Sequence, residues 1–160
     1  MRKQIIKSPS SAASTLTPGG LDVDAIATVL VTSELPGHPV ENAFDGNGGP
    51  GGTRWVSETG GEQTFTLAFD APQAIRTVGL EIEETGESRT QELQLAVSHD
   101  GEKTYRELLR QEFNFVPGVS TFEREEWTIN QEGITHLRLQ IKPEKGGRPS
   151  RASITSLVLR

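Results

Sequence analysis

The sequence predicts an all-β fold, a sandwich or a barrel, and two observations lead to this prediction. Segments rich in β-branched residues recur at about 8–12-residue spacing, with turn residues between them. Helical segments do not alternate with them, which argues against a parallel sheet built from βαβ units. The chain has 160 residues and no cysteine, so it is long enough for one domain with a core that needs no disulfide.

The individual strands are predicted from the alternation of apolar and polar residues. In residues 63–70, Phe65, Leu67 and Phe69 point to one face. Residues 104–115 fit a helix or a strand, and the Asp-Gly turn just before them favours a strand that completes a hairpin. Similar patterns predict further strands at 25–33, 75–84, 91–101, 121–129, 135–143 and 153–160.

Two features of the sequence predict where these strands bend or end. Phe122 and Trp127 are out of phase with each other, which predicts a bulge or a bend near them. Pro72 and Pro143 are expected at strand ends, where a missing N–H group does least harm.

The composition and charge of the chain limit which partners it can bind and where in the cell it is expected. The formal net charge is -6, which argues against nucleic acid because that affinity comes from clustered Lys and Arg. Residues 1–20 are rich in Ser, Thr, Pro and Gly and are expected to form a flexible arm before a domain of residues 21–160. The basic start lacks the apolar run of a signal peptide, and no stretch suits membrane insertion, so a cytoplasmic location is expected.

Several stretches together resemble a known family. The chain contains, in order, VTSELPGHPVENAFDGN, TRWVS, QTFTLAFDAPQAIRTVGLEI, LQLAVSHDGEKTYREL and THLRLQIKP. This series resembles the discoidin domain, also called the coagulation factor 5/8 C-terminal type, which includes galactose-binding carbohydrate modules. The resemblance covers residues 25–160 and implies a jelly-roll sandwich of about eight antiparallel strands.

The resemblance also implies a calcium site in the glycine-rich loop. By position, Asp45 would supply a carboxylate, Asn47 a carbonyl oxygen and Thr53 a hydroxyl or carbonyl oxygen, which are ligands that Ca²⁺ prefers. Trp55 would anchor the loop from beneath. Ser156 stands where metal-binding members usually have a Glu, which removes one carboxylate. The alternative is a structural crossing loop without a metal.

Ligand-binding residues are expected in the loops. Sugar-binding members stack aromatic rings on a sugar and bond its hydroxyl groups through polar side chains. The candidates in this chain are Glu34, His38, Arg89, Asn114 and Phe115. Phe115 could instead fill the core, and Arg89 could pair with a neighbouring Glu.

No enzymatic site is expected. Ser98, His99 and Asp100 are adjacent and cannot form a triad, whose members come from separate segments. Glu81 and Glu83 are expected to share a solvent-exposed face rather than to form an acid–base pair. The sequence therefore predicts a non-catalytic recognition module, lectin-like and carbohydrate-binding. The alternative is an intracellular protein–protein interaction module with the same fold.

Overall fold

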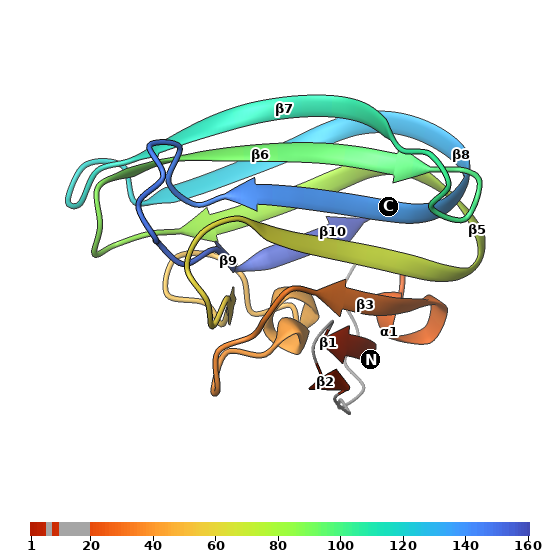
Figure 1. The fold of residues 1–160 in the computed structure, drawn as a ribbon, viewed down its shortest axis with the longest axis horizontal. Coiled ribbons are helices and arrows are strands. Elements are labelled where there is room, and N and C mark those ends of the chain that lie inside the picture. The colour runs from red at the N-terminus through yellow and green to blue at the C-terminus, as the bar shows by residue number, and fades with distance from the viewer. Residues whose placement is uncertain (6–7, 10–19) are drawn as a thin grey trace.

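The computed structural model describes residues 1–5, 8–9 and 20–160, which form two packed layers of strands (Figure 1). The strands are β1 (Arg2–Ile5), β2 (Ser8–Pro9), β3 (Ala27–Val31), β4 (Trp55–Val56), β5 (Gln63–Glu83), β6 (Arg89–Ser98), β7 (Arg106–Phe115), β8 (Phe122–Lys142), β9 (Ser153–Ile154) and β10 (Ser156–Leu159). Two short helices accompany them: α1 (Val23–Ile26) and the 3-10 helix η1 (Val40–Phe44). No helix within these described residues is long and apolar enough to cross a membrane.

The main sheet has the strand order β2-β1-β3-β5-β8-β6-β7, with β10 paired to β5 and a separate pair formed by β4 and β9. The pairings are antiparallel except for β1 and β3, which run parallel. The predicted antiparallel sandwich is therefore confirmed, with this one exception. Residues 104–115 contain the strand that the preceding Asp-Gly turn predicted.

β5 and β8 each continue through both layers. The first half of β5 pairs with β3 and the second half of β8, whereas its second half pairs with β10 and the first half of β8. We call the first group, with β1, β6 and β7, the front layer, which is nearer the viewer in Figure 1. The back layer comprises β10 with the second half of β5 and the first half of β8. Two strands thus join the layers covalently.

The bends of these long strands correct three predictions. Segments 63–70 and 75–84 are one strand, and Pro72 lies inside it rather than at an end. The register of β5 against β8 shifts between Ala68 and Thr77, so the ladder is interrupted around Pro72 and its missing N–H is tolerated. The bulge expected near Phe122 and Trp127 lies instead at this bend.

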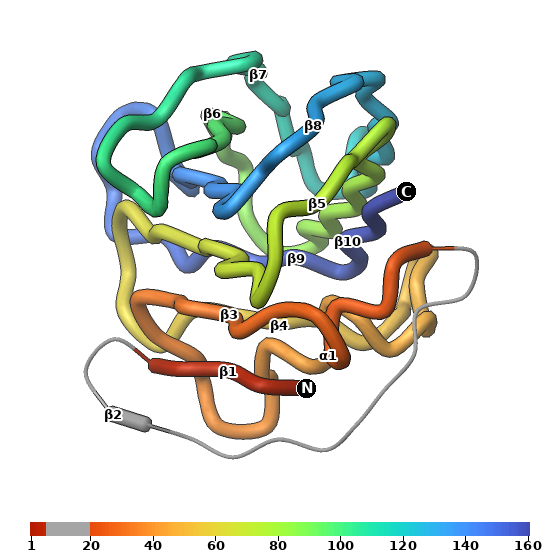
Figure 2. The backbone as a smooth tube through the Cα atoms, turned by 90° about the vertical axis from the view of Figure 1, so that its right-hand side faces the viewer, coloured from red at the N-terminus to blue at the C-terminus, as the bar shows by residue number. Residues whose placement is uncertain are grey.

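The chain ends also differ in detail from the predictions. Residues 2–5, within the expected arm, form β1, and Figure 2 shows this strand beside β3. Residues 6–7 and 10–19 of that arm lie outside the described residues. The strand expected from residue 25 begins at Ala27, because Asp22 caps the short helix α1 by accepting a hydrogen bond from the Ala25 N–H (3.3 Å). Pro143 follows the end of β8, as predicted.

The core lies between the two layers. Trp55 is fully buried, packs edge-on against Phe65 with 5.2 Å between ring centroids, and donates its Nε1–H to the Ser33 carbonyl (3.0 Å). This confirms the expected anchoring role of Trp55. Trp127 of β8 donates its Nε1–H to Gln111 Oε1 of β7 (2.9 Å), which bridges the layers. Both indole N–H groups, of the buried Trp55 and the partly buried Trp127, therefore have an acceptor.

Candidate functional site

The ends of β5 and β8 meet at one end of the sandwich, at the left in Figure 1. We call this the loop end; segments 32–62, 84–88, 116–121 and 143–152 gather there. Backbone hydrogen bonds tie these segments together: Gly61 N–H donates to Ser150 O (3.0 Å) and Glu84 N–H to Thr121 O (2.8 Å). Loops distant in sequence are thereby held as one surface.

A groove of about 500 Å³ opens at the loop end. Its walls come from residues 54–60, 83–87 and 149–153. Its charged lining residues are Arg54, Arg151, Glu83, Glu84 and Glu87. Guanidinium groups donate hydrogen bonds and carboxylates accept them, so the groove can bond groups that do both, such as hydroxyls.

Glu83 fixes one side of this groove. Glu83 is only 7% exposed, and its Oε1 accepts from Arg54 Nη2 at 2.5 Å. Arg54 also donates through Nη1 to the Glu83 carbonyl (3.4 Å). Since a buried carboxylate is costly unless paired, this ion pair is required by the fold and holds Arg54 in place.

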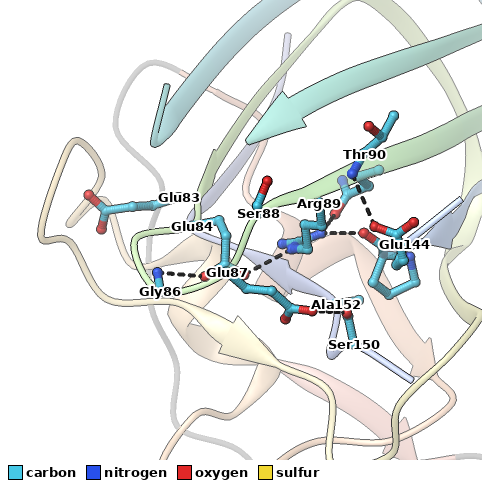
Figure 3. A network of polar contacts seen from close by, with 12 residues as sticks. Glu83, Glu84, Gly86, Glu87, Ser88, Arg89, Thr90, Glu144, Ser150 and Ala152 are labelled. Atoms are coloured by element: carbon cyan, nitrogen blue, oxygen red, sulfur yellow. Dashed lines mark hydrogen bonds and ion pairs between the residues drawn. The ribbon is translucent and has the colours of Figure 1, made fainter. Parts of the chain in front are cut away.

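Arg89 organises the neighbouring β5–β6 turn (Figure 3). Its guanidinium donates to Glu84 Oε1 (2.8 Å), to Gln91 Oε1 (2.8 Å) and to the Pro143 carbonyl (2.7 Å). It also lies over the Phe115 ring, 5.0 Å from its centroid. Arg89 is 3% exposed, so its donors are used inside the protein.

A second set of contacts joins this turn to segment 143–152. Ser150 Oγ donates to Glu87 Oε1 (2.6 Å), and Arg148 donates to Glu144 Oε2 (3.0 Å). The Gly146 N–H, together with Arg148, lowers the pKa of Glu144. The Ser150–Glu87 contact joins two lining residues of the groove.

A second cavity of about 530 Å³ adjoins the groove and shares Arg54, Val56 and Arg151 with it. His38 and Asn42 line its other side. Asn42 Nδ2 donates to the Arg54 carbonyl (3.0 Å), which fixes that wall. The two hollows therefore form one polar surface across the loop end.

The glycine-rich loop closes largely on itself. Asp45 Oδ1 accepts from the Asn47 N–H (2.9 Å), and Oδ2 accepts from Thr53 Oγ1 (2.5 Å). Asn47 O in turn accepts from the Thr53 N–H (3.1 Å). The three predicted metal ligands are thus brought together, but their oxygens already accept hydrogen bonds from one another's groups.

Two carboxylates from β5 hold the same loop from the other side. Glu81 Oε1 accepts from the Gly49 N–H (2.7 Å), and Glu83 Oε1 accepts from the Gly51 N–H (3.0 Å). The prediction that these two glutamates share a solvent-exposed face is therefore wrong, because the glycine-rich loop covers that face of β5. Ser156 pairs with Glu81 in register, so Glu81 lies beside the position of the missing family glutamate.

These donors argue against the expected calcium ion. A cation between β5 and the loop would face backbone N–H groups instead of oxygens. No group of three or more His, Cys, Asp or Glu within the described residues could hold a metal. The calcium site stays a prediction, and the loop is held without a metal by Glu81 and Glu83.

The predicted ligand residues are not brought together. Glu34 accepts from Lys3 Nζ (3.0 Å) and the Val40 N–H (3.0 Å), which ties the first strand to η1. Phe115 is 1% exposed and Arg89 is enclosed, so both pack inside the protein rather than face a ligand. Asn114 is exposed, and its Oδ1 accepts from Thr90 Oγ1 (2.8 Å). His38 is the only one of the five that lines a loop-end hollow.

Sequence reasoning missed Arg54, Arg151 and Glu87, which line the groove. The groove also lacks an aromatic wall. The chain has six Phe, two Trp and one Tyr, and none of them lines either hollow. The linings therefore offer hydrogen-bonding groups but no ring for stacking.

The F5/8 type C domain family model matches residues 28–156, and the chain belongs to this family. The family predicted from the sequence is therefore confirmed. No curated protein matches the chain.

Similar solved structures are carbohydrate-binding modules. One is CBM32-3 from a family 31 glycoside hydrolase of Clostridium perfringens, with a TM-score of 0.63, 19% identity, and coverage of 88% of this chain and 93% of that one. Another is the CBM32 of AlyQ in complex with 4,5-unsaturated mannuronic acid, with a TM-score of 0.59, 20% identity, and coverage of 84% of this chain and 95% of that one. A third is the family 32 module of C. perfringens NanJ in complex with galactose, with a TM-score of 0.56, 16% identity, and coverage of 83% of this chain and 92% of that one. At these identities the likeness shows the fold.

Proposed function

We propose that this domain is a non-catalytic carbohydrate-binding module whose ligand occupies the loop-end groove. The observation that carries the proposal is the mixed charge of the groove, in which Arg54 and Arg151 face a space shared with Glu83 and Glu87. Sugar hydroxyls donate and accept hydrogen bonds, so this lining suits an uncharged sugar. The carbohydrate-binding modules among the structural neighbours support the ligand class.

The absence of catalysis is part of this proposal. Glu83 is engaged by Arg54, and Glu84 by Arg89, so both carboxylates are already held in ion pairs. Glu87 accepts a hydrogen bond from Ser150. An acid–base pair needs a group free to exchange protons with a substrate, and these groups serve structure instead.

Arg151 is the residue through which the proposal is best tested. It is exposed in the groove, and its Nε donates to the Glu58 carbonyl (3.1 Å), which orients the side chain. The purified domain is first screened on a glycan array, and the best neutral sugar is then titrated by calorimetry. We expect Arg151→Gln to weaken binding at least about tenfold, because hydrogen bonds from a charged donor are lost.

The matched control is Arg76→Gln, an exposed arginine in the bend of β5, away from the loop end. It should leave the affinity unchanged. A blank array, or an equal loss in both variants, would overturn the proposal.

A protein partner is the second candidate, and one observation favours it. The turn after β7 exposes Val116 (43%) and Val119 (83%) at the loop end. Exposed apolar side chains at this end of the sandwich suit a protein contact better than a sugar. The blank array named above would favour this candidate.

A further inference from the structure

The outer face of the front layer carries an arginine that the loop-end site does not explain. Arg138 lies in the second half of β8, paired with Thr66 on one side and Ala96 on the other. Leu137 and Leu139 on either side of it are fully buried, so Arg138 points away from the core. An outward-facing arginine in a sheet commonly forms an ion pair with a residue of a neighbouring strand, but Arg138 forms none with the residues that the structure describes.

A tyrosine holds the Arg138 side chain in place. The guanidinium carbon lies 3.8 Å from the centroid of the Tyr105 ring, and the Tyr105 hydroxyl donates to Glu102 Oε1 (2.9 Å). Burial, reinforced by this carboxylate, raises the pKa of Tyr105, so the ring remains a neutral phenol. The cation–π contact fixes the plane of the guanidinium while leaving its N–H groups unused.

Arg138 lacks the acceptors that a half-buried guanidinium needs. Its Nε is buried and has no hydrogen-bond partner within residues 1–5, 8–9 and 20–160. In the same part of the chain no carboxylate forms an ion pair with it, although acidic residues outnumber basic ones by 22 to 16. An unsatisfied buried donor costs stability, and the Nη groups, which are not buried, are the part of the guanidinium that can take an acceptor from outside.

The positions that flank Arg138 on β8 and on its two partner strands carry no carboxylate. Its nearest positions in register are Thr64, Thr66, Ala68, Gln94, Ala96, Ser98, His136 and Gln140, and none is a carboxylate. Glu102 approaches the site, but it bonds Tyr105 and lies 3.8 Å from His136 Nε2. Glu107 of β7 pairs in register with Ala96, one strand further out, and forms its ion pair with Arg110. Within the described residues neither carboxylate pairs with Arg138, so an anion from outside can take that place.

We propose that this face, centred on Arg138, is a second binding site, separate from the loop-end groove, for a uronic acid residue of an acidic polysaccharide. A guanidinium fork matches a carboxylate bidentately. The threonine and glutamine side chains around it can bond the sugar hydroxyls. An acidic peptide fits less well, because the middle of a sheet offers no free strand edge for backbone pairing.

The experiment titrates the intact domain with an oligogalacturonate and follows binding by calorimetry. Wild type should bind, and Arg138→Gln should weaken binding at least about tenfold. Gln140→Glu, a nearly isosteric change on the same face, should weaken it as well by giving Arg138 an internal carboxylate. Circular dichroism checks that each variant is folded.

Three controls make the result decisive. Arg76→Gln removes one positive charge elsewhere and should bind the oligogalacturonate like wild type. Arg151→Gln should also bind it normally, so failure here is distinguishable from failure of the loop-end proposal. A polyglutamate peptide should not compete. The proposal is overturned if wild type does not bind, if Arg76→Gln loses as much as Arg138→Gln, or if polyglutamate competes equally.

Discussion

Glu83 connects the glycine-rich loop, the groove and β5 through one carboxylate. It accepts from the Gly51 N–H and from Arg54, and it is nearly enclosed. A charged acceptor in this position is stronger than a neutral one, because its hydrogen bonds lie in a region of low dielectric. The shape of the loop end therefore depends on the charge of this residue as much as on its size.

We expect Glu83→Gln to destabilise the domain by about 1–3 kcal/mol, since Arg54 would lose its charged partner while staying partly buried. Urea unfolding measures the change. Glu132→Gln, the same substitution at an exposed position, should change stability by less than about 0.5 kcal/mol. Equal stabilities for the two variants would show that the Glu83–Arg54 pair contributes nothing.

The role of Glu81 and Glu83 shows where sequence reasoning stops. Alternation correctly places them on one face of β5, opposite the buried Leu80 and Ile82. It cannot say that a loop from some thirty residues earlier covers that face. Arg151 escaped notice for the same reason: its place in the groove depends on how distant loops pack.

At the level of elements, strand content was predictable but strand continuity was not. The alternating patterns of 63–70 and 75–84 are each correct, yet the chain continues between them as β5. Segment 153–160 shows the reverse, because it divides into β9 and β10 on different sheets. Local pattern fixes which face is buried; partners across the sheet decide where a strand ends.

The glycine-rich loop gives a prediction at this scale, that its structure does not need calcium. Its amides are held by Glu81 and Glu83, so we expect the same melting temperature in chelator and in millimolar calcium. Thermal unfolding in both buffers, with limited proteolysis of the loop, measures this. A cation at about a hundred times its Kd would instead add about 2.7 kcal/mol, or about 5–10 °C in a domain of this size.

At the scale of the whole molecule, β5 and β8 make the front and back layers one cooperative unit. Each strand supplies half its length to one layer and half to the other. Loss of either layer would expose the buried faces of the strands that remain, including Leu95 of β6 and Leu157 of β10. The two layers should not unfold separately.

We therefore expect Leu95→Ala in the front layer and Leu157→Ala in the back layer to lower a single common transition. Each removes a fully buried side chain and should cost about 2–5 kcal/mol. Differential scanning calorimetry should show one peak in both variants, with equal calorimetric and van't Hoff enthalpies. Two resolved transitions, with only one shifted by each substitution, would mean that the bends of β5 and β8 uncouple the layers rather than join them.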